Sequence, residues 1–225
     1  MIDPAVIAWL PATPMLVPDI TGEPDVTVAT LRSAADDAVK RAARDDPPVI
    51  AVVAPTDAPH TGETGAWSWH GFGVGYRPPA DTLPWQIGLG AWLLDRAGWH
   101  GPRCYVGVAA DGESATPASR ALALAVANGG NLLVLGDGCA GLDEGSAPDL
   151  IHDARVWDEQ VASTVGSGDA AALAAIDTAG TGRTASAATT YPLVARLLTK
   201  VNRRAETLYR GAPFGIDYLV ATWSI

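Results

Sequence analysis

The order in which apolar runs and helical patterns follow one another most restricts the fold of this chain. Residues 5–10 (AVIAWL) and 49–54 (VIAVVA) are apolar runs of strand length, and each is followed by proline. Between them, residues 26–46 place apolar side chains on one helical face, while Asp36 and Lys40 stand four residues apart on the other. This pattern predicts a strand, a helix and a second strand.

The alternation continues through the middle of the chain. Residues 83–98 and 114–129 have helical patterns, and each is followed by an apolar run, at residues 104–110 and 131–136. Strands that are apolar throughout and alternate with helices are typical of parallel sheets buried on both faces. We therefore predict an α/β fold with a mostly parallel central sheet and helices on both faces.

The second half of the chain has a different character. Residues 149–165, 169–177 and 191–206 have helical patterns, and residues 216–223 alternate well enough to form a last strand. Residues 65–76 alternate glycine or polar residues with aromatics, which suggests an irregular hairpin or a lid. A length of 225 residues with 48% hydrophobic residues fits a single domain over residues 1–225.

Charge and hydropathy argue against two classes of partner. The formal net charge is −10 at pH 7, which would repel a phosphate backbone, so we expect no nucleic acid partner. The one local basic cluster is interpreted as the solvated end of the helix predicted at 191–206. No apolar run approaches the ~18 residues of a membrane span, so no membrane partner is expected. The cluster contains Lys200, Arg203, Arg204 and Arg210.

The first residues and the cysteines bear on the compartment. Asp3 and the absence of Lys or Arg before Arg32 argue against a secretory signal, so we expect a cytoplasmic protein. Cys104 and Cys139 lie in separate segments and have neither a disulfide pattern nor a zinc spacing. The sequence leaves open whether the chain forms a homo-oligomer.

Gly136, Gly138 and Gly141 match the spacing of a nucleotide-binding glycine loop. That motif needs a helix directly after the glycines, whereas here acids and helix breakers follow. Asp137 would also face the pyrophosphate. We therefore reject this interpretation.

Polar residues follow three of the predicted strands, where open α/β sheets bind ligands. Asp137 has an equally weighted alternative role as a turn former or helix cap. His60, just beyond the second strand, and Cys139, two residues after Asp137, are candidate catalytic residues together with Asp137. The candidate ligand-binding residues are Thr13, Thr56, Asp57, Gly136, Asp137 and Gly138.

Four segments in order resemble a known family. They are LPATPMLVPDI after the first strand, VVAPT after the second, VLGDGCA after a later strand, and LYRGAPFGIDYLVATW near the C-terminus. Together they resemble the class III extradiol dioxygenase (LigB-like) superfamily, and more narrowly its uncharacterised members of actinobacterial type. The resemblance implies a LigB-like α/β fold, a non-haem Fe(II) held by two histidines and a carboxylate, and a further histidine that acts as acid and base in catechol ring opening.

All three family histidines are replaced in this sequence. The first ligand belongs in a Pro-His-x-Pro stretch, where Ala12 stands, and the second follows Ser-Pro, where Thr56 follows Ala54-Pro55. The catalytic histidine ends Gly-Asp-x-Ser-His, where Ala140 stands. Alanine cannot bind iron and a threonine hydroxyl is a poor substitute for imidazole, so we expect no metal and no cofactor.

Two hypotheses of function follow. The first is a pseudoenzyme, a non-catalytic scaffold that binds a small molecule or a protein at the crevice near Asp137. The second is an enzyme with a rebuilt active site, of metal-dependent dioxygenase or hydrolase type, formed by Asp57, His60, Asp137 and Cys139. It requires His60 or Cys139 within hydrogen-bonding distance of Asp137. The loss of every recognisable ligand favours the first hypothesis.

Overall fold

The computed structural model describes residues 4–23, 25–75, 80–110, 115–127, 129–142, 147–179, 185–198 and 203–225. Its strands are β1 (Val6–Leu10), β2 (Ile50–Pro55), β3 (His60–Gly62), β4 (Arg103–Val108), β5 (Asn131–Leu135), β6 (Arg204–Gly211) and β7 (Tyr218–Ser224). Its helices are α1 (Pro18–Thr21), α2 (Val26–Ala42), α3 (Trp85–Arg96), α4 (Ala115–Val126), α5 (Pro148–Ser167), α6 (Ala170–Ala174) and α7 (Ala187–Leu197). Two short 3-10 turns are η1 (Pro14–Leu16) and η2 (His70–Phe72).

The strands of the described residues form one seven-stranded sheet in the order β3-β4-β2-β5-β1-β7-β6. The inner strands β4, β2, β5 and β1 are parallel to one another. β3 pairs antiparallel with β4, β7 with β1, and β6 with β7. The prediction of a mostly parallel sheet is therefore wrong, because the sheet is mixed. The reason is local: antiparallel neighbours need no crossover helix, so the final hairpin can extend the sheet beyond β1.

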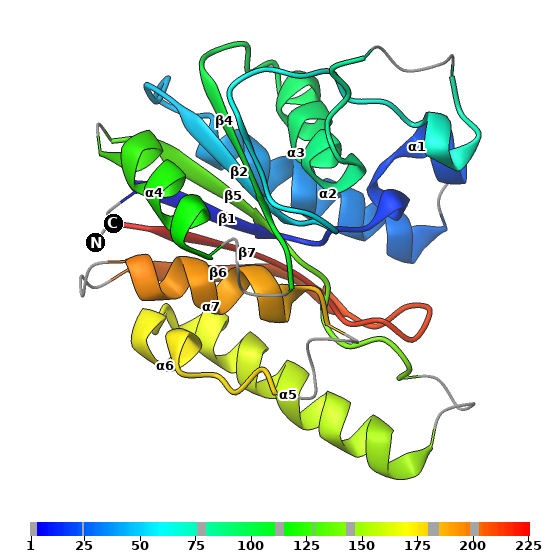
Figure 1. Cartoon of the computed structure of the whole chain (residues 1–225). Helices are drawn as coiled ribbons and strands as arrows, with labels where there is room; N and C mark the ends of the chain where they lie inside the picture. The colour runs from blue at the N-terminus through cyan, green and yellow to red at the C-terminus, as the bar shows by residue number, and fades with distance from the viewer. Residues whose placement is uncertain are drawn as a thin grey trace.

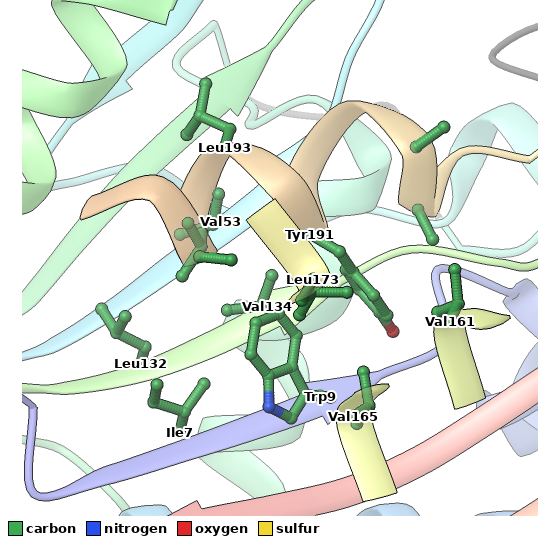
Figure 2. Packing of buried hydrophobic residues seen from close by; sticks show 14 of the residues in the cluster. Ile7, Trp9, Val53, Leu132, Val134, Val161, Val165, Leu173, Tyr191 and Leu193 are labelled. Atoms are coloured by element: carbon green, nitrogen blue, oxygen red, sulfur yellow. The ribbon is translucent and has the colours of Figure 1, made fainter. Parts of the chain in front are cut away.

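Helices cover both faces of the sheet, as predicted (Figure 1). Ile7 and Trp9 of β1 point into a core built with α4, α5, α6 and α7, while Ala8 and Leu10 point into a second core built with α2 and α3. This alternation is the two-residue period of a strand. Figure 2 shows Trp9 beside Tyr191 of α7 in the first core, where their ring centroids are 4.8 Å apart.

The prediction that a helix continues to residue 206 is wrong. Helix α7 ends at Leu197, and residues 204–211 form strand β6 instead. Arg204 and Arg210 therefore lie on an edge strand rather than at a helix end, and Lys200 lies outside the described residues. Charged side chains are suited to an edge strand, because they discourage pairing with another chain.

Residues 65–75 pack against helix α3 through aromatic rings. Trp69 is buried, and its ring centroid lies 6.2 Å from that of Trp92 and 5.5 Å from that of Trp67. This segment contains turn η2, and residue 76 lies outside the described residues. Within the part of the chain that the structure describes, no helix has the length and apolar character needed to cross a membrane.

Candidate functional site

The carboxyl ends of β1, β2 and β5 lie at one edge of the sheet. The strand register places Trp9 and Val53 on either side of Val134. Three residues beyond these positions come Ala12, Thr56 and Asp137, so these three follow neighbouring strands at the same level. The two positions where the resemblance expects iron ligands therefore follow the two strands on either side of β5, the strand that leads to Asp137.

Hydrogen bonds hold Asp137 from two sides. Its Oδ1 accepts the backbone N–H of Ala12 at 2.8 Å, and its own N–H donates to Ser186 Oγ at 2.8 Å. Its carbonyl oxygen accepts the N–H of Ala187, at the start of α7, at 2.9 Å. Among the described residues, no hydrogen bond to Oδ2 is present. One carboxyl oxygen is thus fixed on the protein, and the other has no hydrogen-bond partner among the described residues.

Burial raises the pKa of Asp137 to about 7, and the hydrogen bond from Ala12 offsets only part of this effect. The residue keeps some accessible surface, although its carboxyl group is closely surrounded by protein atoms. Desolvation penalises the charged form of a carboxyl group, which accounts for the direction of the shift. Asp137 can therefore gain or lose a proton near neutral pH.

Two tyrosine hydroxyl groups lie close to this carboxyl, and Thr13 hydrogen bonds with one of them. The Tyr191 hydroxyl donates towards the carbonyl oxygens of Gly136 (3.2 Å) and Leu10 (3.4 Å). Burial raises the pKa of Tyr218, a hydrogen bond with Thr13 lowers it, and the charge of Asp137 raises it. Thr13 and Tyr218 are both buried. Thr13, a predicted ligand-binding residue, is thus part of the same neighbourhood.

The glycines on either side of Asp137 are explained by packing. A Cβ atom on Gly136 would lie 2.6 Å from Ala187 Cα, and one on Gly138 would lie 2.7 Å from Asp158 Oδ1. Atoms of the protein itself fill the space that the missing side chains leave. Gly136 and Gly138 therefore bring α7 and α5 close to the loop that carries Asp137.

Two further aspartates, from distant parts of the chain, contact this loop, Asp158 through its carboxyl group and Asp217 through its backbone. Asp158 Oδ1 accepts the N–H of Cys139 at 2.9 Å, and the carbonyl oxygen of Asp217 accepts the N–H of Gly138 at 2.9 Å. Burial raises the pKa of Asp158 to about 6 and also raises that of Asp217, which lies 3.5 Å from Arg210 Nε. Neither residue is among the predicted site residues.

The four residues of the rebuilt-site hypothesis do not come together. Cys139 is fully buried, and its thiol hydrogen bonds with Asp158 rather than with Asp137. His60 is on β3, paired with Gly107 of β4, so three strand spacings, about 14 Å in all, separate it from β5. Asp57 is exposed. The partner that this hypothesis requires for Asp137 is therefore not supplied by His60 or Cys139.

The residues at the expected iron-ligand positions do not fit an iron ion. Ala12 presents a backbone N–H, which donates to Asp137 and has no lone pair for a metal. The Thr56 hydroxyl donates to the carbonyl oxygen of Ala58 at 2.8 Å. In the described parts of the chain, no three His, Cys, Asp or Glu side chains are placed to share a metal ion.

These features define a class: an α/β protein with a mixed sheet and a half-buried carboxyl group, whose pKa is raised, at the carboxyl edge of its parallel strands. Its fold is similar to that in the crystal structure of uncharacterized protein JW3007 from Escherichia coli K12. That likeness has a TM-score of 0.55 at 14% sequence identity and covers 97% of this chain and 99% of the other. At this identity the likeness shows the fold alone. No protein-family model and no curated protein matches the chain.

Proposed function

We propose that this chain is a small-molecule-binding protein with a LigB-like fold that lacks the iron chemistry of the extradiol dioxygenases. Its ligand binds at the carboxyl ends of β1, β2 and β5, and Asp137 is the anchor. The observation that carries the proposal is the state of the Asp137 carboxyl group. One oxygen is held by the Ala12 N–H, and no hydrogen bond from the described residues reaches the other.

The chemistry of this carboxyl group defines the ligand. An ionised carboxylate accepts hydrogen bonds, and such bonds are about twice as strong as those between neutral groups. The ligand therefore carries O–H or N–H donors. Because the pKa of Asp137 is about 7, the anchor is charged only above neutral pH, and affinity rises as the pH passes through that value.

A titration with catechol tests the proposal, because the resemblance implies a catechol as the ligand of related proteins. Catechol binding is followed by the intrinsic tryptophan fluorescence of the wild type, Asp137→Asn and Asp153→Asn at pH 6 and pH 8. Asp153 is an exposed carboxylate on α5 and serves as the matched control. We expect saturable binding that is tighter at pH 8 and about 10-fold weaker in Asp137→Asn, from the loss of one charged hydrogen bond. Equal affinities in the wild type and Asp137→Asn would refute the role of Asp137.

The second candidate is an enzyme that uses Asp137 as a general base. The observation in its favour is the pKa of about 7, since a general base works best when its pKa is near the operating pH. Hydrolysis of p-nitrophenyl acetate tests this candidate. A rate above that of Asp137→Asn, with a rise centred near pH 7, supports the enzyme. A rate identical in both proteins at every pH leaves binding as the function.

A further inference from the structure

Asp158 is a buried carboxyl group with one oxygen in use and one without a partner. The residue is 3% exposed and lies on α5. Its Oδ1 accepts the N–H of Cys139 at 2.9 Å, and the Cys139 thiol also hydrogen bonds with this carboxyl group. No hydrogen bond reaches the buried Oδ2 among the residues that the structure describes. A buried carboxylate oxygen without a partner is costly, so this oxygen is a favourable place for a proton.

The contact between Asp158 and the loop is close because Gly138 has no side chain. A Cβ atom there would lie 2.7 Å from Asp158 Oδ1 and 2.9 Å from Asp217 Cβ. The Asp217 backbone also exchanges two hydrogen bonds with the loop, from Gly138 N–H at 2.9 Å and to the Cys139 carbonyl at 3.3 Å. Residues 136–142 are therefore clamped between α5 and the start of β7.

We propose that Asp158 is a positioning residue, which controls how firmly residues 136–142 hold Asp137 by gaining or losing its own proton. It regulates ligand binding through Cys139 and does not touch the ligand. This inference rests on the proposed function, because it assigns a means of regulation to the same site.

The groups that face Asp158 determine the direction of the effect. Burial raises its pKa to about 6; the Cys139 N–H lowers it and the charge of Asp217 raises it. Arg210 of β6 lowers it, while it bridges Asp217 at 3.5 Å and Glu159 of α5 at 2.7 Å. The ionised form is the stronger acceptor for the Cys139 N–H. This gain is smaller than the cost of burying the charge, which is the largest cause of the raised pKa, so the loop is held more firmly below pH 6 than above it.

Amide hydrogen exchange of the ligand-free protein tests the proposal without any ligand. Exchange of the Cys139 amide is measured at pH 5 and pH 7, corrected for intrinsic rates, and divided by the protection of Leu133 in the centre of β5. We expect the ratio to fall with pH in the wild type and in Asp153→Asn, and to fall about tenfold further than in Asp158→Asn, because the packed loop holds this proton with a pKa near 6 against the ordinary 3.8. In Asp158→Asn, residue 158 cannot ionise, so only the fall caused by Asp137 remains. A ratio that falls equally in the wild type and in Asp158→Asn overturns the proposal.

A second measurement covers the case in which Asp158→Asn does not fold. In the wild type, the ¹³C resonance of the Asp158 carboxyl group and the ¹⁵N resonance of Cys139 are followed from pH 4.5 to pH 8. We expect both to share one inflection near pH 6; a Cys139 resonance that does not follow Asp158 overturns the proposal. Catechol can fail to bind while the exchange ratio behaves as expected. The proposed function is then wrong, but the role of Asp158 in holding residues 136–142 is still supported.

Discussion

Replacing Asp137 by asparagine should make the protein more stable at alkaline pH. The size of this gain in the free energy of unfolding follows from the pKa of Asp137. The folded pKa is about 7 and the ordinary value is 3.8, so the folded state binds this proton more tightly than the unfolded state. The contribution of Asp137 to the stability of the wild type is therefore largest below pH 4, and it is lost as the pH rises through 7. Asparagine keeps the oxygen that accepts the Ala12 N–H but carries no titratable proton.

The size of the stability difference follows from the gap between the ordinary pKa of Asp137 and its raised pKa in the folded protein. Each pKa unit is worth 1.36 kcal/mol, so the stability of Asp137→Asn relative to the wild type should rise by about 3 kcal/mol between pH 4.5 and pH 8. Contributions from other titrating groups, Asp158 included, are common to both proteins and cancel in the difference.

Urea denaturation of the wild type, Asp137→Asn and Asp153→Asn at pH 4.5, 6 and 8 provides the measurement. Asp153 is exposed, so its variant should follow the wild type at every pH. The two proteins differ in their free energy of unfolding, and this difference should change with pH. A change of less than 1 kcal/mol across this range would show that the Asp137 carboxyl group is ionised in the folded protein well below neutrality. Burial would then not raise the pKa of this carboxyl group.

Three other changes have defined outcomes. Tyr191→Phe removes the hydroxyl that donates to Gly136 and Leu10, and should lower the free energy of unfolding by about 1–2 kcal/mol; an unchanged urea midpoint would contradict these bonds. Gly138→Ala forces a Cβ to within 2.7 Å of Asp158 Oδ1 and should cost about 2 kcal/mol or more, whereas Gly71→Ala, with open space around its Cβ, should be nearly neutral. Elemental analysis of protein purified without chelator and then titrated with Fe(II) or Zn(II) should find no stoichiometric metal; bound metal that Asp137→Ala abolishes would restore a metal-dependent enzyme as the leading hypothesis.

The inner strands could be predicted because their sequences are apolar throughout. Residues 5–10, 49–54, 104–110 and 131–136 correspond to β1, β2, β4 and β5, which are the buried parallel strands. The antiparallel edges were harder to foresee. β6 carries charges on a half-exposed edge, and β3 has only three residues, so neither has a continuous apolar run. For this reason the helix predicted at 191–206 runs on into the residues that form β6.

The candidate site was predicted only where it follows a strand directly. Asp137 comes straight after β5, whereas Asp158 and Asp217 reach its loop through the packing of α5 and β7. One signal for Asp158 was present in the sequence. It lies among Ala154, Trp157 and Val161 on the apolar face of its helix, where a carboxylate is out of place. Asp217 carries no comparable signal, because the hairpin that positions it was not predicted.

The position of β1 has a consequence for how the chain folds. The first strand lies in the interior of the sheet, between β5 and the final strand β7. Its pairing with β7 joins Val6 to Ser224, at nearly opposite ends of the sequence. Contacts of such long sequence separation form late and slow the folding of a domain. During synthesis, one side of β1 therefore stays unpaired until residues 218–224 have left the ribosome, and truncation before residue 218 would leave that strand edge open to other chains.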